Sequence, residues 1–305
     1  CSHHCAYCIV PLLRGPAVSR PAAEVVAEAE RLLAAGFREL TLSGVNLRQY
    51  GMGGPLPKGW TFWRLVRRLE RELAPEWAGR ARLRLSSLDP AQLDDEALET
   101  LAASRLVAPH LHLSLQSLAP EVLLRMRRGH YGPEVVHRFL DRLGQIWPVF
   151  GLGADFIAGF PGETDKDATR TLENAAALPL TYAHVFPFSP RPGTPAALMD
   201  GQTPQAAKKE RAAQLRALVA RKRQAFLKRQ ARRDRLTVVL EDDAPWRGRD
   251  EFYVECRFSC APPDAARRVM THGMYIPPSP PNWATSIHAS AKEADAPSVR
   301  SVYRR

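Results

Sequence analysis

The sequence has no long apolar stretch, little cysteine and a shortage of acidic residues. Without a run of about 18 apolar residues or an apolar leader, it predicts neither a membrane span nor a secretory signal peptide. Five cysteines in 305 residues argue against a disulfide framework and favour a reducing compartment, so we expect a cytoplasmic protein. The 32 acidic residues face 43 Lys and Arg, and the net charge of +11 favours an anionic partner such as nucleic acid.

Three of the five cysteines lie within the first eight residues. Cys1, Cys5 and Cys8 have Cys-x3-Cys-x2-Cys spacing. A structural zinc site takes four protein ligands, whereas a cubane iron-sulfur cluster with three cysteine ligands keeps one iron open to S-adenosylmethionine (SAM). The alternatives are a chance group of buried thiols and a zinc knuckle completed by His3 or His4. Adjacent histidines in so short a gap are poorly placed to reach that metal, and no second ligand pair follows at finger-like spacing.

Apolar strands alternate with amphipathic helices along the first two thirds of the chain. We predict strands at residues 39–44, 81–86, 110–115, 152–157 and 182–186, and helices at 21–35, 62–73, 94–102, 120–127, 133–146 and 164–177. Alternation of this kind is typical of an α/β fold with parallel strands. It predicts a barrel or part of one, with the functional site at the carboxyl ends of the strands.

Polar or small residues recur at those strand ends. Gly44, Asn46, Ser86 and Gln116 follow or close successive predicted strands, and Asp155 lies within the fourth. Each of them alone is adequately explained as a turn residue. Their recurrence at one end of a parallel sheet favours a shared binding site.

From residue 1 to about 230 the chain resembles the radical SAM methylthiotransferases. The motifs that carry the resemblance are the cysteine loop with the Ile9–Gly15 and Ser19–Pro21 stretches, Gly159–Thr164, and Ser189–Ala196. Residues 84–90, 112–117 and 184–189 are most similar to the branch that modifies N6-threonylcarbamoyladenosine in tRNA. They are less similar to the branches that act on N6-isopentenyladenosine or on a ribosomal protein.

The resemblance implies that Cys1, Cys5 and Cys8 hold a [4Fe-4S] cluster that cleaves SAM, supplied with electrons by flavodoxin or ferredoxin. The radical formed would take hydrogen from C2 of adenosine 37 beside the tRNA anticodon, and a methylthio group would replace it. Other possibilities are activity on N6-isopentenyladenosine, a radical SAM enzyme with another outcome such as methylation, and an inactive fragment that only binds RNA.

Eight further residues are candidates for cofactor or substrate contacts: Tyr7, Gly44, Asn46, Ser86, Gln116, Arg125, Arg128 and Asp155. Tyr7 is a candidate to lie on the adenine of SAM or only to shield the cluster. Arg125 and Arg128 are candidates to pair with the SAM carboxylate, since a guanidinium binds carboxylate well, or to face water at a helix end. The Gly159–Thr164 turn is expected either to direct N–H groups at a ligand or only to reverse the chain.

A strongly basic helical stretch begins after Pro204. Its candidates for contact with tRNA phosphate are Lys208, Lys209, Arg221, Lys222, Arg223, Lys228, Arg229, Arg232 and Arg233. Charged runs are usually solvated faces, but one this lopsided, beside a nucleotide-modifying site, favours RNA.

The expected fold is thus a partial (β/α)6 radical SAM barrel without its first strand, followed by a small, incomplete β-barrel similar to the family's TRAM domain. We predict a radical SAM core at 1–200, a basic helical connector at 201–234, a partial TRAM-like segment at 235–270 and a disordered tail at 271–305, which includes the Pro277–Pro281 run. Cys256 and Cys260 are expected to be structural. The family's N-terminal domain, with three cysteines for a second [4Fe-4S] cluster, is expected to be missing.

Overall fold

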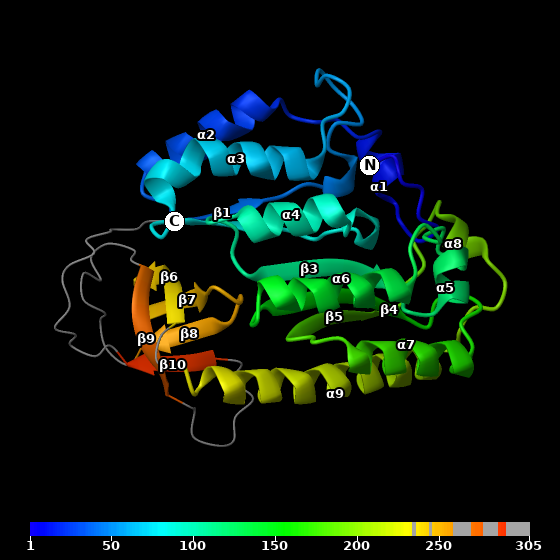
Figure 1. Ribbon diagram of the computed structural model, residues 1–305. Coiled ribbons are helices and arrows are strands. Elements are labelled where there is room, and N and C mark those ends of the chain that lie inside the picture. Colours follow the sequence, from blue (N-terminus) through cyan, green and yellow to red (C-terminus); the bar gives the residue numbers. More distant parts are fainter. Residues whose placement is uncertain (234–235, 244–245, 259–269, 277–285, 291–305) are drawn as a thin grey trace.

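Parallel strands form the larger part of the protein (Figure 1). The computed structural model describes residues 1–233, 236–243, 246–258, 270–276 and 286–290. The parallel strands are β1 (Glu39–Leu42), β2 (Arg82–Leu85), β3 (His110–Gln116), β4 (Gly151–Ala158) and β5 (Tyr182–Pro187). β1 pairs with β2, and β3, β4 and β5 form a second sheet. Isolated parallel bridges from Leu83 to Val107 and from Leu88 to Leu113 link the two sheets. The predicted partial barrel of parallel strands is confirmed.

Helices cover the outer faces of both sheets. The longer ones are α2 (Ala22–Ala34), α3 (Phe62–Trp77), α4 (Asp95–Ala103), α6 (Pro133–Ile146), α7 (Asp165–Ala177) and α9 (Gln205–Gln230). The shorter ones are α1 (Val10–Arg14), α5 (Pro120–Arg125), α8 (Pro195–Leu198) and the 3-10 turns η1 (Leu47–Gln49) and η2 (Pro90–Gln92). The predicted capping pair is present at α7, where Thr164 and Asp167 satisfy each other's backbone N–H groups. No described helix is both long and apolar enough to cross a bilayer.

Side chains alternate between two environments along each parallel strand. On β3, Leu111, Leu113 and Leu115 are fully buried and belong to the main hydrophobic core together with the covering helices. The intervening residues, His110 and His112, point to the opposite side. There they meet polar side chains of the other strands. We call the space on this inner side of β1–β5 the lumen.

A second, smaller barrel lies at the amino ends of the parallel strands (Figure 1). Its strands are β6 (Leu236–Asp243), β7 (Trp246–Asp250), β8 (Glu255–Phe258), β9 (Met270–Ile276) and β10 (Ser286–Ser290). The sheet order is β10-β8-β7-β6-β9, and β9 also pairs with β10, so the sheet closes. Phe226 of α9 packs in its core with Leu236 and Phe252. The two parts are joined by Arg82 and Arg84, which donate hydrogen bonds to carbonyl oxygens of β6 and β7.

The extent of the second barrel differs from the prediction. β9 and β10 lie almost wholly within residues 271–305, where a disordered tail was predicted, and with them the barrel is closed instead of incomplete. Neither segment has the regular apolar alternation by which a strand is predicted. Both are strands because their backbones pair with neighbours, β9 with β6 and β10 with β8. Cys256 is fully buried in this barrel, and burial raises the pKa of its thiol, in keeping with a structural role. Cys260 and the Pro277–Pro281 run lie outside the described residues.

Candidate cluster and cofactor site

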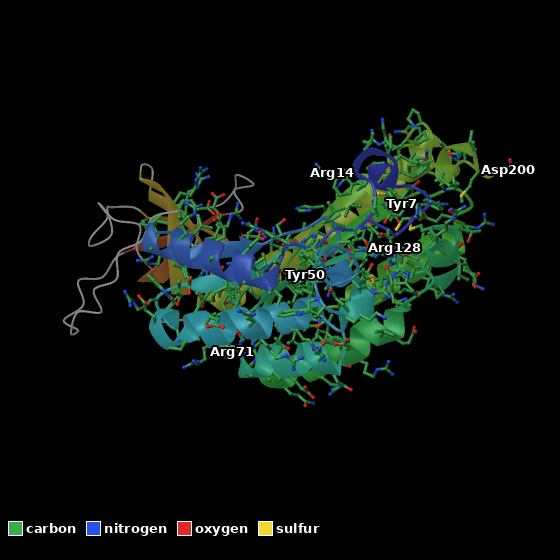
Figure 2. All side chains as sticks on the ribbon, turned by 90° about the horizontal axis from the view of Figure 1, so that it is seen from above. Tyr7, Arg14, Tyr50, Arg71, Arg128 and Asp200 are labelled. Atoms are coloured by element: carbon green, nitrogen blue, oxygen red, sulfur yellow. The ribbon has the colours of Figure 1, made fainter. Side chains whose placement is uncertain are left out.

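The cysteine loop lies at the carboxyl ends of the parallel strands. Its centre is fixed by backbone hydrogen bonds: the N–H of Ala6 donates to the carbonyl of Met126 at 3.0 Å, and the N–H of Ala196 donates to the carbonyl of Ala6 at 2.8 Å. Tyr7 packs edge-on against Phe160, with ring centroids 6.5 Å apart. Figure 2 shows Tyr7 and Arg128 at the same end of the molecule. The loop is therefore anchored to the elements that follow β3 and β5.

Two of the three thiols have nitrogen donors beside them. Nδ2 of Asn46 lies 3.8 Å from Sγ of Cys1, and a guanidinium nitrogen of Arg128 lies 3.7 Å from Sγ of Cys5. Cys1, Cys5 and Cys8 are all free. Donors of this kind tune the reduction potential of a cluster held by those sulfurs. These residues therefore fit a [4Fe-4S] cluster with one open iron.

Arg128 belongs to a buried charge network under the loop. It is 5% exposed, and its guanidinium lies 3.0 Å from a carboxylate oxygen of Asp89, which also contacts His130 at 3.2 Å. Burial acts to raise the pKa of Asp89, but the Arg128 charge and the Ala91 N–H outweigh it and hold that pKa below its usual value. The alternative that Arg128 faces water is wrong, because its side chain is buried. Its charge is already paired with Asp89, which disfavours Arg128 as a partner for the SAM carboxylate.

The other strand-end candidates lie where the topology predicts. Asn46 is the N-cap of η1, where its side-chain oxygen accepts the N–H of Arg48 while its amide nitrogen lies near Cys1. Ser86 follows β2, and its buried hydroxyl has no hydrogen-bond partner in the described structure. Gln116 closes β3 with φ of +60°, a conformation that costs energy in a non-glycine residue and is frequent at functional sites. A buried hydroxyl without a partner and a strained backbone both favour a ligand at this end.

The Gly159–Thr164 turn is held internally. Glu163 accepts the N–H of Gly159 and a hydrogen bond from Arg211, both at 3.0 Å. Gly162 has φ of +77°, and a Cβ there would lie 2.5 Å from the guanidinium of Arg125. Arg125 is exposed and packs on this turn. These contacts explain Gly162 by the reversal of the chain and its close packing on Arg125, without a ligand.

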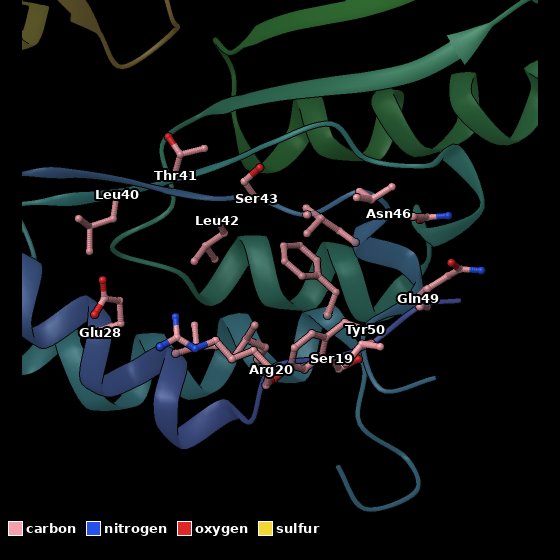
Figure 3. A pocket seen from close by; sticks show the side chains of 18 of the residues that line it. Ser19, Arg20, Glu28, Leu40, Thr41, Leu42, Ser43, Asn46, Gln49 and Tyr50 are labelled. Atoms are coloured by element: carbon pink, nitrogen blue, oxygen red, sulfur yellow. The ribbon is translucent and has the colours of Figure 1, made fainter. Parts of the chain in front are cut away.

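A cavity of about 680 Å³ opens beside Cys1, between α2 and β1. Asn46 and Gln49 lie at one end of it, and Glu28 and Leu40 lie toward the other (Figure 3). Gly44 also lines it, and a Cβ at that position would approach Leu47 to 3.1 Å. Its volume falls in the range of small-molecule sites, roughly 300–1,000 Å³. Among the described strands β1 pairs only with β2, so its other edge borders this cavity.

Asp155 lies deeper in the lumen, in a group that sequence reasoning missed. One of its carboxylate oxygens lies 3.0 Å from Nε2 of His112 and 3.1 Å from Nδ1 of His184. Burial acts to raise the pKa of Asp155, but its bonds to the two histidines prevail and lower it. Tyr182 contacts Nδ1 of His112 at 2.9 Å. These residues occupy inward-facing positions of three adjacent strands. Aligning the predicted strands by their alternating pattern could have grouped them from the sequence alone.

The basic helix α9 has two kinds of cation. Lys209, Arg221, Lys228, Arg229 and Arg232 are exposed, the last just beyond the helix. The predicted contact of Lys208 with tRNA phosphate does not fit the structure. Lys208 is 6% exposed, and its ammonium lies 5.0 Å from the Phe188 ring centroid because this face of the helix packs on the parallel barrel. Lys222 and Arg223 donate to the carbonyls of Leu178 and Thr181, and Arg233 lies over Phe252. Only the exposed set remains suited to phosphate contact.

Comparison with known proteins finds similarity in sequence and in structure. Residues 1–175 match the radical SAM superfamily. The chain is 42% identical over 216 residues to the threonylcarbamoyladenosine tRNA methylthiotransferase MtaB of Rickettsia prowazekii, a match that covers 71% of this chain and 49% of the relative. The chain thus spans about half the length of that relative.

Two solved structures are similar to this chain at low sequence identity. The coproporphyrinogen III oxidase HemN of Escherichia coli, a radical SAM enzyme, is 20% identical with a TM-score of 0.47 and covers 75% of this chain and 50% of its own. Methylornithine synthase PylB is 18% identical with a TM-score of 0.46 and covers 72% and 60%. With the superfamily match and the cysteine loop, the chain belongs to the radical SAM superfamily, and within it the chain is similar to the methylthiotransferases.

Proposed function

We propose that the chain is the radical SAM core of a tRNA methylthiotransferase that acts at C2 of N6-threonylcarbamoyladenosine 37. The observation that carries the proposal is the free three-cysteine loop at the carboxyl ends of the strands, in a chain 42% identical to a relative with that name. When bound, the cluster and SAM would supply one-electron cleavage of the sulfonium, with the electron from a flavodoxin- or ferredoxin-like donor.

The chain's own residues would bind and orient the reactants. Cys1, Cys5 and Cys8 would hold the cluster, with Asn46 and Arg128 donating to two of the sulfurs. Gly44 and Ser86 would border SAM, since one allows close approach and the other offers a buried hydroxyl without a partner. The lumen would receive the target base and keep water away from the radical.

The exposed cations of α9 would bind tRNA phosphates. Charge reversal at Lys228 and Arg232 to Glu should weaken tRNA binding and reduce its dependence on salt, because fewer counterions are released. Arg71→Glu on α3 is the control, since Arg71 is also an exposed arginine, and α3 and α9 lie on opposite sides of the molecule (Figure 1). Equal losses in both variants would argue against a defined RNA face on α9.

The reaction is tested in two stages because the chain spans half of its relative. After anaerobic reconstitution with iron and sulfide, the chain should bind about four irons and release 5′-deoxyadenosine from SAM on reduction. Cys5→Ala should lose both properties. Mass spectrometry of tRNA nucleosides from cells with and without the intact gene should show loss of the methylthio group from threonylcarbamoyladenosine.

The outcomes separate the alternatives. A missing methylthio group on isopentenyladenosine would reassign the substrate but keep the reaction. A missing methyl group would indicate a radical SAM methylase. Zinc in place of iron, or unchanged 5′-deoxyadenosine release in Cys5→Ala, would overturn the proposal.

A further inference from the structure

We propose that His112, Asp155 and His184 form a binding site in the lumen for a single divalent transition-metal ion, distinct from the cysteine loop. Their ligand atoms, Nε2 of His112, a carboxylate oxygen of Asp155 and Nδ1 of His184, all lie within 4.8 Å of one another. Two imidazoles with one carboxylate form a ligand set typical of ferrous iron, and imidazole also suits zinc.

The two distances from the carboxylate oxygen to the imidazole nitrogens suit ligands of one ion. Ligands about 2.1 Å from a metal and at right angles to each other lie about 3.0 Å apart. The Asp155 oxygen lies 3.0 Å from the His112 nitrogen and 3.1 Å from the His184 nitrogen. A metal could therefore bind the carboxylate oxygen and both imidazole nitrogens in place of the present Asp155–histidine contacts.

The strands and their neighbours hold these ligands in place. His112, Asp155 and His184 come from β3, β4 and β5, and Asp155 stands opposite His184 in the β4–β5 register. The hydroxyl of Tyr182 lies 2.9 Å from Nδ1 of His112, so it can accept that N–H and leave Nε2 for a metal. Gly153 makes room for both rings, because a Cβ there would lie 2.5 Å from His112 and 2.2 Å from Tyr182.

Exposure differs between the ligands in a way that suits an open site. The side chain of His112 is 11% exposed and that of Asp155 is 21% exposed, whereas that of His184 is 58% exposed. An ion held here would keep coordination positions on the open side for water or a substrate oxygen. Sites that bind reactants keep such positions, in contrast to closed structural sites.

The second His-Asp-His group, His3, Asp89 and His130, fits a cation less well. Its ligand atoms also lie within 4.8 Å of one another, but Asp89 is paired with Arg128, and a nitrogen of Arg48 lies 2.9 Å from Nε2 of His3. Two guanidinium groups at the ligand atoms repel a further cation. This group therefore supplies an internal control.

The test is Co2+ titration of the full chain with Cys1, Cys5 and Cys8 changed to Ser, which removes competing thiolates. Visible absorption and metal analysis should show one Co2+ per chain without thiolate charge-transfer bands. His184→Ala should weaken binding by more than tenfold, and Asp155→Asn, which preserves shape, should do the same. Tyr182→Phe should weaken it about tenfold, as loss of a group that orients a ligand does.

His130→Ala is the matched control and should leave Co2+ affinity unchanged. Circular dichroism checks that each variant is folded. No stoichiometric binding, affinity unchanged in both His184→Ala and Asp155→Asn, or affinity lost in His130→Ala would overturn the site. The assay uses neither SAM nor tRNA, so its result is independent of the proposed methylthiotransferase reaction.

Discussion

Two buried aspartates at opposite ends of the parallel strands have opposite titration behaviour. Asp89, beside the cysteine loop, is 5% exposed, and its pKa lies below the usual value because Arg128 and a backbone N–H outweigh burial. Asp250, where the second barrel meets the amino ends of the strands, is fully buried, and burial raises its pKa to about 7. Both carboxyl groups are buried, so the difference between their pKa values comes from the charged and hydrogen-bonding groups beside each of them.

The difference extends to the groups around them. At the amino end, Glu39 pairs with Arg82 and Arg84, which also donate to the barrel backbone, while Nη1 of Arg84 and Oδ2 of Asp250 have no hydrogen-bond partner among the described residues. At the carboxyl end, thiols and the hydroxyl of Ser86 remain available. Charge density alone therefore does not mark the functional end of this lumen. Buried polar atoms without a partner occur at both ends among the described residues, so they do not mark it either, and the three-cysteine loop is the better indicator.

The largest effect is expected from Glu39→Gln. It leaves Arg82 and Arg84, which are 6% and 3% exposed, without their carboxylate, and breaking such a buried pair costs about 3–5 kcal/mol. The two arginines lower the pKa of Glu39 to about 2 despite burial, which acts to raise it. The resulting stability is present above pH about 4.5 and is lost as pH falls toward 2. Denaturant unfolding across that range should show a smaller acid loss in the variant than in the wild type, because other carboxylates with lowered pKa values, such as Asp89, remain.

Asp250→Asn should have the next largest effect on stability. In contrast to Glu39→Gln, it should stabilise the protein at neutral pH. Because the folded pKa of about 7 lies above that of an unfolded aspartate, the native state binds the extra proton and stability falls as pH rises from about 4 to 7. The loss is at most about 4 kcal/mol. Asparagine keeps the oxygen that accepts the N–H groups of Phe252 and Val254. The variant should be more stable than the wild type at pH 7.5, and unchanged pH dependence would contradict the assignment.

Much of this contrast could not be predicted from the sequence. Strand and helix positions followed from apolar periodicity, and the cysteine loop from spacing alone. The pairing of Arg128 with Asp89 joins residues 39 positions apart and depends on how η2 packs under the loop. Lys208 was misassigned because a basic run does not reveal which helix face packs on the sheet. β9 and β10 were missed because their pairing partners are distant in sequence.

Arg128→Met should have a smaller effect on stability, at the carboxyl end. It leaves Asp89 with His130 and the Ala91 N–H, so we expect a loss of about 2–3 kcal/mol. Asp89→Asn in the same background should recover part of it, since the unpaired charge is removed. Cys5 also loses a donor to its sulfur, so the reconstituted cluster should have a lower reduction potential by redox titration. An unchanged potential would mean that the Arg128 contact to sulfur is incidental.

The smallest effect is expected from Glu24→Gln, which matches Glu39→Gln in chemistry but not in environment. Glu24 pairs with Arg20 at 3.3 Å across one helical turn, and the two side chains are 58% and 56% exposed. Water and salt screen such a pair, so its loss should cost no more than about 0.5 kcal/mol. Denaturant unfolding of both variants at pH 7 compares the same substitution at a buried and an exposed position. If the two losses were similar, burial of Glu39 with its arginines would not be the source of its stabilising effect, and the contrast between the two ends would have to rest on the aspartates alone.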